Sequence, residues 1–201
     1  MIRPLSLLVL AAALAPSIAS AQAEDGTKWR MTVTPGKLKP ITIPDRIRTG
    51  DAKTYWYTVL EIKNETGKER NLGLAAKGLT EVKKSPVILP GLYPEVTKAI
   101  QQRERDKDIV NLFEASGEIG DGETKKVLVL FANLDTEVNL LDLRVKGLAN
   151  TLYKEGSKVY YEDTELSVKF HRIGDEYEVT RQRVEIKEKR WVEVERKKVR
   201  D

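Results

Sequence analysis

The feature that most constrains the fold of this chain is the two-residue period of its apolar residues. In the segments LLDLRVKGL (140–148) and TELSVKFHRI (164–173), apolar residues alternate with polar or charged ones. Successive side chains of a strand point to opposite faces, so this period predicts strands with one buried face and one face in water. Clusters of Gly, Asn and Asp at 64–68, 120–123 and 174–176 separate such segments and predict turns.

Two further segments are predicted to contribute buried side chains to the core. One face of YWYTVLEIKN (55–64) is predicted to be buried, through Trp56, Leu60 and Ile62. The opposite face begins with Tyr55 and Tyr57, which leaves an aromatic binding platform open as an alternative use. The run Val127–Phe131 is apolar throughout, as expected for a central strand that is covered on both faces.

One segment departs from the two-residue period. It begins with Pro94, which suits the first position of a helix, and places Val96 and Ile100 four residues apart. We therefore predict one inserted α-helix at about 94–106, covering a sheet edge or one end of the core. The preceding stretch KKSPVILPG (83–91) contains two prolines and is predicted to form an irregular loop or edge.

The first residues have the pattern of a secretory signal peptide. Arg3 is followed by an apolar run at 5–14 and by the small-residue motif AQA at 21–23. The apolar run is too short to span a bilayer, which takes about 20 residues. We expect residues 1–23 to be removed and residues 24–201 to be exported as one soluble domain, periplasmic or extracellular. An uncleaved N-terminal anchor is the alternative.

The composition excludes several kinds of chemistry. The chain has no cysteine and one histidine, which excludes disulfides, thiol nucleophiles, Cys-based metal sites and His clusters. Charged residues are abundant and nearly balanced, with 35 Lys and Arg against 31 Asp and Glu and a formal net charge of +4. This small excess of bases is weak support for a polyanionic partner and mainly indicates a well-solvated surface.

Several motifs occur together in an order that resembles a known kind of domain. An aromatic-rich strand ends in Asn-x-Thr-Gly (64–67), the corner Gly-Glu-Thr (122–124) precedes the apolar run 127–131, and LLDLRVKGL (140–148) follows. This order resembles exported bacterial immunoglobulin-like domains of an uncharacterised family, over about residues 54–172. Asn64 also begins a formal glycosylation sequon, but the turn context favours a turn-capping role.

The predicted fold class is therefore all-β. We expect an immunoglobulin-like antiparallel β-sandwich with one inserted helix and a charged C-terminal strand or tail at 178–201. The long loop and helix at 83–108 and this C-terminal segment depart from the family pattern. The resemblance implies a fold and leaves the function open, because one fold hosts many functions.

Residues with catalytic chemistry are few. A Ser-His-acid triad would need His171, which the period places on a polar face beside Lys169 and Arg172, where a base tends to lose its proton. Asp121 and Glu123 are candidates for a carboxylate pair or a calcium site, but they lie in a turn, where such residues mainly set the backbone. We name no catalytic residue, no cofactor-binding residue and no metal ligand.

The C-terminal segment RQRVEIKEKRWVEVERKKVR (181–200) is the best candidate for a partner site. Its Trp191 follows Arg190 and lies among further bases, and aromatic and basic residues together bind anionic polymers. The interleaved glutamates favour instead a salt-bridged edge strand. An edge to which another protein adds a strand is a third alternative. Tyr93, after the Pro-containing loop, is the other candidate partner-binding residue.

These observations predict an exported, non-enzymatic β-sandwich module that binds a protein or an envelope polymer. We expect no nucleic acid as partner and no transmembrane segment after signal cleavage. Two alternatives stay open, an extracytoplasmic carboxylate-dependent hydrolase and a purely structural envelope component. A concave site with two converging carboxylates would favour the hydrolase.

Overall fold

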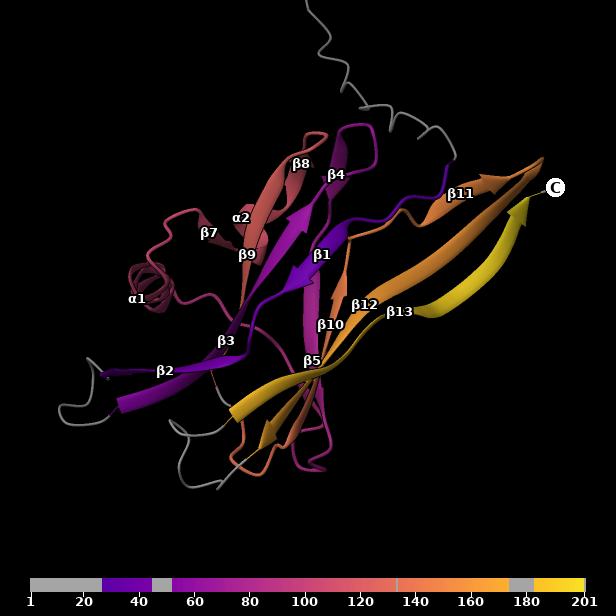
Figure 1. Cartoon of the computed structure of the whole chain (residues 1–201). Helices are drawn as coiled ribbons and strands as arrows, with labels where there is room; N and C mark the ends of the chain where they lie inside the picture. The colour runs from indigo at the N-terminus through magenta and orange to yellow at the C-terminus, as the bar shows by residue number, and fades with distance from the viewer. Residues whose placement is uncertain (1–26, 45–51, 133, 174–182, 201) are drawn as a thin grey trace, which may run out of the picture.

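The fold is known from a computed structural model that describes residues 27–44, 52–132, 134–173 and 183–200. These residues form two large sheets that face each other, together with a small two-stranded sheet and two helices (Figure 1). The strands pair in antiparallel fashion, apart from the parallel pair β7 and β9. The predicted all-β sandwich is therefore confirmed.

The strands of the two large sheets come from all parts of the described chain. The first sheet has the order β1-β3-β9-β7, with β2 also paired to β3: β1 (Thr32–Pro35), β2 (Lys39–Pro44), β3 (Ala52–Lys63), β7 (Ile109–Asn111), β9 (Thr124–Phe131). The second sheet has the order β11-β12-β10-β5-β6, with β13 also paired to β12: β5 (Ala75–Thr80), β6 (Val87–Ile88), β10 (Leu140–Lys146), β11 (Leu152–Glu155), β12 (Lys158–Ile173), β13 (Arg183–Arg200). The small sheet pairs β4 (Arg70–Leu72) with β8 (Gly117–Ile119).

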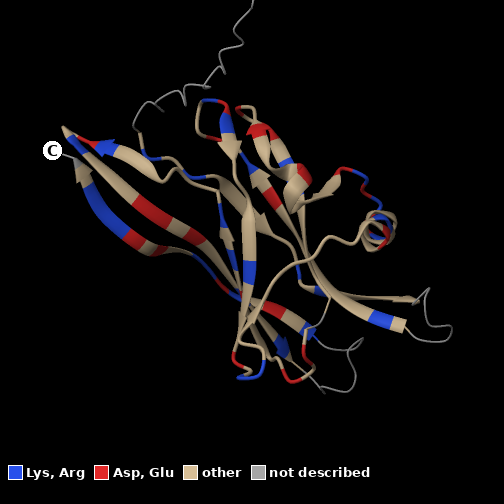
Figure 2. Cartoon of the chain, turned by 180° about the vertical axis from the view of Figure 1, so that it is seen from behind, with Lys and Arg blue, Asp and Glu red and all other residues tan. Residues whose placement is uncertain are grey.

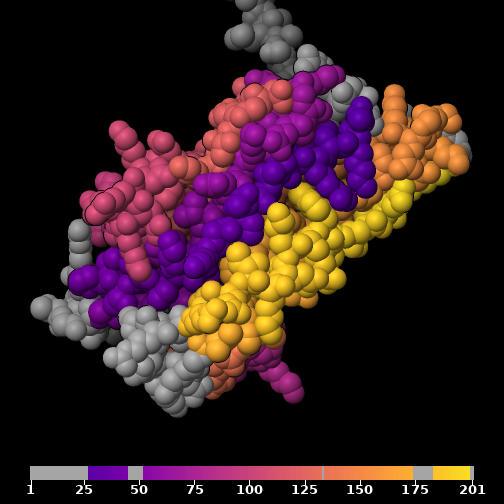
Figure 3. Space-filling model, viewed as in Figure 1, coloured from indigo at the N-terminus to yellow at the C-terminus, as the bar shows by residue number. Residues whose placement is uncertain are grey.

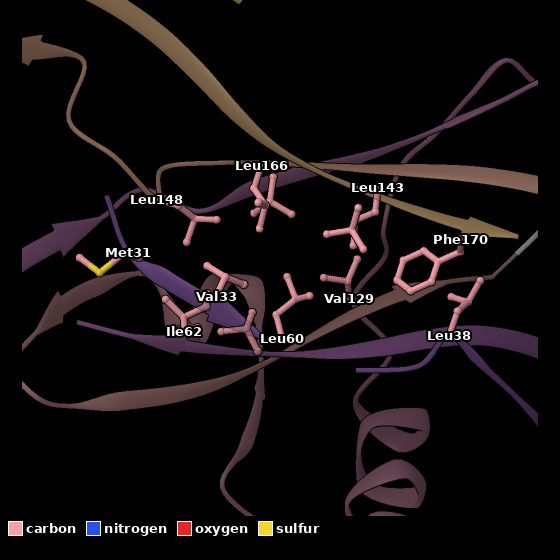
Figure 4. Close-up of a cluster of buried hydrophobic side chains, with 14 of the residues drawn as sticks. Met31, Val33, Leu38, Leu60, Ile62, Val129, Leu143, Leu148, Leu166 and Phe170 are labelled. Atoms are coloured by element: carbon pink, nitrogen blue, oxygen red, sulfur yellow. The ribbon is translucent and has the colours of Figure 1, made fainter. Parts of the chain in front are cut away.

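The main core lies between the two large sheets (Figure 4). From the first sheet, Trp56, Leu60 and Ile62 are 2%, 0% and 0% exposed, which confirms the predicted register of β3. A shift by one residue would have placed all three on the other face. The facing side chains come from β10 and β12, and they are the alternating apolar residues of those strands: Leu141, Leu143, Val145, Leu166, Val168, Phe170.

A second apolar cluster covers the outer face of the first sheet. The helix α1 (Pro94–Glu104) buries Val96 and Ile100 against Leu128 and Leu130 of β9. This confirms both the predicted helix and the central strand with two covered faces. It also corrects the binding-platform hypothesis for Tyr57, whose side chain is 1% exposed in this cluster. The polar residues at the end of β3 had indicated water on this face, but the helix covers the stretch before them.

The turn after β3 is built around a buried asparagine. Asn64 is 0% exposed, and its side-chain nitrogen donates to the carbonyls of Lys68 and Ile119. Its side-chain oxygen accepts from the backbone and the hydroxyl of Thr66. The predicted turn-capping role is confirmed, because each polar atom of this side chain is used inside the fold.

The sequence did not indicate a second helix, but the structure has one. α2 (Leu112–Ala115) begins with a capping box, in which the Asn111 side chain accepts from the backbone of Glu114 and the Glu114 side chain accepts from the backbone of Asn111. This pattern of Asn followed by Glu three residues later was visible in the sequence. In the described residues no helix is both long enough and apolar enough to cross a membrane.

The C-terminal segment forms β13, an edge strand that pairs along the whole of β12. Figure 3 shows β13 on the surface beside the chain of β1 and β2, where Lys189 Nζ donates to the carbonyl of Val33 at 2.9 Å. The prediction of a salt-bridged edge strand is supported by the cross-strand pair Lys169–Glu188, at 2.7 Å.

The outer face of the second sheet carries a network of ion pairs that we call the charge ladder. Glu165 of β12 is almost fully buried and accepts from Lys77 of β5 at 3.0 Å. The neighbouring pairs are Arg144–Asp142 at 2.7 Å and Lys146–Asp163 at 2.5 Å. Lys77–Glu165 and Lys146–Asp163 join adjacent strands, and Arg144–Asp142 lies within β10, so part of the high charge content is matched on this face.

Candidate functional site

The chain between β1 and β2 forms an elbow that positions two lysines. Gly36 donates from its backbone nitrogen to the carbonyl of Val59, and the Thr58 hydroxyl donates to the carbonyl of Gly36. A Cβ at Gly36 would lie 2.8 Å from the Val59 carbonyl oxygen, so a side chain does not fit there without a backbone shift. Lys37 and Lys39, which follow, are therefore held at the edge of the first sheet.

Beside this elbow lies a cavity of about 480 Å³ that we call the basic groove. Its walls come from four separate segments: the elbow, β2, the end of α1 and the start of β13. The lining residues are Lys37, Leu38, Lys39, Pro40, Thr42, Arg103, Arg183 and Val184. Four of them are cations, and none of the described residues that line the groove is a carboxylate.

The four cations of the basic groove differ in their partners. Lys39 donates to both carboxylate oxygens of Glu104 at 2.8 Å, and Arg103 donates to the backbone carbonyl of Pro40 at 2.6 Å. Arg183 pairs with Glu185 at 2.8 Å, but its side chain is 78% exposed. Within the described part of the chain, Lys37 is exposed and forms no ion pair. The groove therefore keeps donors that an anion can reach.

A second cavity, of about 290 Å³, shares Lys37 and Lys39 with the basic groove, and we call it the charged pocket. It contains two ion pairs, Lys39–Glu104 and Lys126–Asp106, the latter at 2.5 Å. The hydroxyl of Tyr57 lies at its floor and donates to Glu104 at 2.5 Å. Four of its six charged lining residues are joined in these two ion pairs, and the lining contains carboxylates, unlike that of the basic groove.

The protonation of the charged pocket is set by these pairs. Burial alone would raise the pKa of Glu104, but the hydrogen bonds from Lys39 and Tyr57 outweigh it and hold the pKa below its ordinary value. The hydrogen bond from Lys126 likewise lowers the pKa of Asp106. Burial, and then the Glu104 carboxylate, raise the pKa of Tyr57. At neutral pH both carboxylates are therefore ionised and the phenol is neutral.

This arrangement gives the hydrolase hypothesis no support among the described residues. A two-carboxylate hydrolase needs one acid that keeps its proton near neutral pH, so that it can protonate a leaving group. Glu104 and Asp106 both have lowered pKa values and both contact a lysine. In the described chain no group of three or more His, Asp or Glu side chains lies close enough together to hold a metal ion.

The structure separates the candidate residues named from the sequence. Tyr93 precedes α1 and packs edge-to-face on Tyr55, with ring centroids 5.2 Å apart, beneath the helix. Trp191 is half-buried against the main core and lies under the guanidinium of Arg30 at 5.1 Å. Arg190 is exposed and pairs with Glu188 at 3.2 Å. None of the three lines the basic groove.

Asp121 and Glu123 stabilise a turn, and His171 has no role that the structure defines. Asp121 accepts from the backbone nitrogen of Gly67 at 2.9 Å, and Glu123 accepts from that of Gly120 at 2.8 Å. Both contacts fix the turn before β9, in agreement with the conformational role predicted for them. His171 lies half-buried on β12, in register with Leu140 and Glu185.

The residues of the basic groove were missed because no local pattern joins them. Lys37 and Lys39 stand two residues apart in GKLK, Arg103 lies in the helix and Arg183 in the last strand. They meet only when β2 pairs with β3 and β13 crosses the open side of the sandwich (Figure 3). No family model, curated protein or solved structure gives a significant match to this chain. The resemblance to an exported immunoglobulin-like family therefore stays a prediction.

Proposed function

We propose that this protein is an exported binding module that holds an anionic envelope polymer in the basic groove and catalyses no reaction. One observation carries the proposal: cations from four separate segments line one concavity, and no carboxylate is among the described residues of its lining. Lys37 of the groove forms no ion pair within the described chain, whereas Lys77, Arg144 and Lys146 of the charge ladder each contact a carboxylate.

The physical basis is the field of the groove. Cations that share a concave wall concentrate their potential there and attract a polyanion over several ångströms. Arginine presents a planar set of donors that matches phosphate, sulfate or carboxylate oxygens. The exposed ion pair of Arg183 contributes little to stability, so Arg183 can exchange Glu185 for a ligand at small cost.

The proposal is tested by the binding of fluorescently labelled inorganic polyphosphate, measured by anisotropy over a series of salt concentrations. Replacing two groove cations, in Lys37→Gln/Arg183→Gln, is expected to weaken binding by about tenfold or more, since each charge-assisted contact is worth roughly 1 kcal/mol or more. The dependence of log K on log salt should become shallower by roughly one to two units.

The matched control is Lys83→Gln/Lys84→Gln, which removes the same charge from the turn between β5 and β6. It should bind polyphosphate within about twofold of the parent protein, apart from a weak effect of net charge. Absence of binding at low salt, or equal weakening in both double variants, would contradict a specific site in the groove.

A further inference from the structure

A second basic surface lies at the far end of β13. The strand β11, the first part of β12 and the last part of β13 extend beyond the first sheet as a three-stranded arm (Figure 1). The inner face of this arm continues the core-facing side of the second sheet, but no strand of the first sheet pairs with or faces it in Figure 1. Near the base of the arm the segment before β1 covers this face, where Tyr153 and Glu162 are each 2% exposed.

Aromatic rings and cations cover this face together. Tyr153 and Tyr160 stack with ring centroids 5.7 Å apart. The Lys28 ammonium lies 5.0 Å from the Tyr153 ring, and the Arg196 guanidinium lies 4.8 Å from the Tyr160 ring. Stacking on a tyrosine fixes a guanidinium while its N–H edges still point to water or to a ligand.

The base of the arm is rigid because of one buried carboxylate. Glu162 accepts from Lys28 at 2.6 Å and 2.7 Å, and its side chain is 3% exposed. It also accepts from Arg30 at 3.3 Å and from the Tyr153 hydroxyl at 2.9 Å. These bonds hold the segment before β1 onto β12, so the charges of Lys28 and Arg30 are used within the protein.

The cations that remain accessible on this face are Arg196 and Lys198, both exposed. Lys197 points to the opposite face, where its ammonium lies 5.1 Å from the Tyr161 ring. Arg196 pairs with Glu155 at 3.3 Å, and Lys197 with Glu195 at 3.2 Å. Exposed pairs of this kind contribute little to stability and exchange readily for a stronger anion. Figure 2 shows the basic stretch near the C-terminal end of β13.

One strand joins this surface to the basic groove. β13 carries Arg183 in the groove at its start and the arm bases Arg196 and Lys198 near its end. At about 3.3 Å per residue the two sites are separated by roughly 45–50 Å along the strand, less where it twists or bulges. Because β13 pairs with β12 throughout, this separation is fixed by the sheet.

We propose that the ligand is a linear, phosphate-bearing polymer long enough to bind the basic groove and the arm at once. The inference rests on the proposed function and adds to it a second contact surface and a minimum length. A polymer with a charge on each repeat suits two cationic sites, because its affinity comes from charge density. An acidic peptide would need apolar anchor pockets or a free sheet edge in addition.

The experiment compares short and long inorganic polyphosphate chains, with extended lengths well below and well above the separation of the two sites, by calorimetry at one salt concentration. The short chain should bind the parent protein through the groove alone. The long chain should bind on the order of 100-fold more tightly per molecule, since the second contact forms within one complex.

Variants separate the two sites. Arg196→Gln/Lys198→Gln should remove most of the gain with length and leave the short chain within about twofold, whereas Lys37→Gln/Arg183→Gln should weaken both chains. In one contrary outcome, the parent protein binds the short chain and binds the long chain more tightly only in proportion to its number of phosphates. That result would overturn the two-site inference but would still support binding in the groove. Failure of both chains to bind would reject the groove itself. Tighter binding of poly-glutamate than of polyphosphate of equal charge would also overturn the inference, in favour of an acidic protein.

Discussion

The charge ladder and the basic groove contain the same kinds of cationic side chain, but the two regions differ in the carboxylates that surround these cations. In the ladder, Lys77 and Arg144 project from neighbouring strands at spacings that bring a carboxylate within about 3 Å of each. In the groove, Lys37 and Arg103 come from an elbow and a helix end, where no regular ladder supplies a partner. Regular strand pairing thus matches charges with carboxylates within the fold, whereas at these junctions Lys37 has no ion pair in the described chain and Arg103 binds a backbone carbonyl.

The comparison predicts opposite effects for similar substitutions. Changes in the ladder should alter stability and leave polyphosphate binding unchanged. Changes in the groove should alter binding and leave stability unchanged. The tests below follow from the largest expected effect on stability to the smallest.

Replacement of the buried ladder carboxylate should have the largest effect. Glu165→Gln leaves Lys77, Arg144 and Lys146 around an uncharged amide, at a site where the Glu165 side chain is 4% exposed. We expect a loss of about 3 kcal/mol in the free energy of unfolding, as for other broken buried pairs, measured by urea denaturation. The control Glu137→Gln, in an exposed pair with Lys84, should cost less than about 0.5 kcal/mol. If Glu165→Gln lowers the free energy of unfolding by less than about 1 kcal/mol, the ladder contributes no more than ordinary surface ion pairs.

A methyl group at the elbow should act on both stability and binding. Gly36→Ala pushes a Cβ to 2.8 Å from a backbone oxygen of β3, which cannot move without disturbing the sheet. A destabilisation of about 1–3 kcal/mol is expected, with weaker polyphosphate binding because Lys37 and Lys39 are displaced. Gly73→Ala is the matched control, because nothing lies within 4 Å of a Cβ there. Equal stability of the two variants would show that the elbow is not constrained as described.

Acid should weaken the fold through carboxylates held by cations. Hydrogen bonds from Lys28 and Tyr153 outweigh burial and lower the pKa of Glu162 from 4.5, the value expected in the unfolded chain. The folded state therefore binds fewer protons, so this stabilisation is present above about pH 4.5 and is lost as the pH falls through the lowered pKa. Thermal unfolding between about pH 7 and pH 3 should show this loss, and Glu162→Gln should show a shallower slope below pH 4.5. Identical dependence of thermal stability on pH in the two proteins would show that Glu162 does not contribute to this loss.

The groove variant should have the smallest effect on stability. Lys37 and Arg183 are both exposed, and the exposed pair of Arg183 contributes little. Lys37→Gln/Arg183→Gln should therefore change the free energy of unfolding by less than about 0.5 kcal/mol while it weakens polyphosphate binding. A large loss of stability would assign these cations to the fold.

The difference between ladder and groove also explains which features of the fold and the site could be predicted from the sequence. The two-residue period of β3 was enough to predict the burial of Trp56 and Ile62, because a strand has only two faces. Pro94 and the spacing behind it were enough to predict α1. The period could not show that this helix lies over Tyr57, since the packing of a helix on one sheet face is a long-range event.

The basic groove could not be predicted from the sequence, because it too depends on long-range packing. Lys37 and Arg183 lie at opposite ends of the described chain, and their meeting depends on β13 crossing the open side of the sandwich. The prediction for Trp191 rested on aromatic and basic neighbours along the sequence and concerns another part of β13. In space, Trp191 packs on the core and beneath Arg30.

The most direct test of the central claim is a titration of ¹⁵N-labelled protein with a short inorganic polyphosphate, followed by amide chemical shifts. The account predicts progressive shifts for the residues that line the basic groove, with Lys37 and Arg183 among the largest, and little change for Lys77, Arg144 and Lys146 of the charge ladder. Shifts centred on the charge ladder, or spread evenly over all exposed cations, would contradict it.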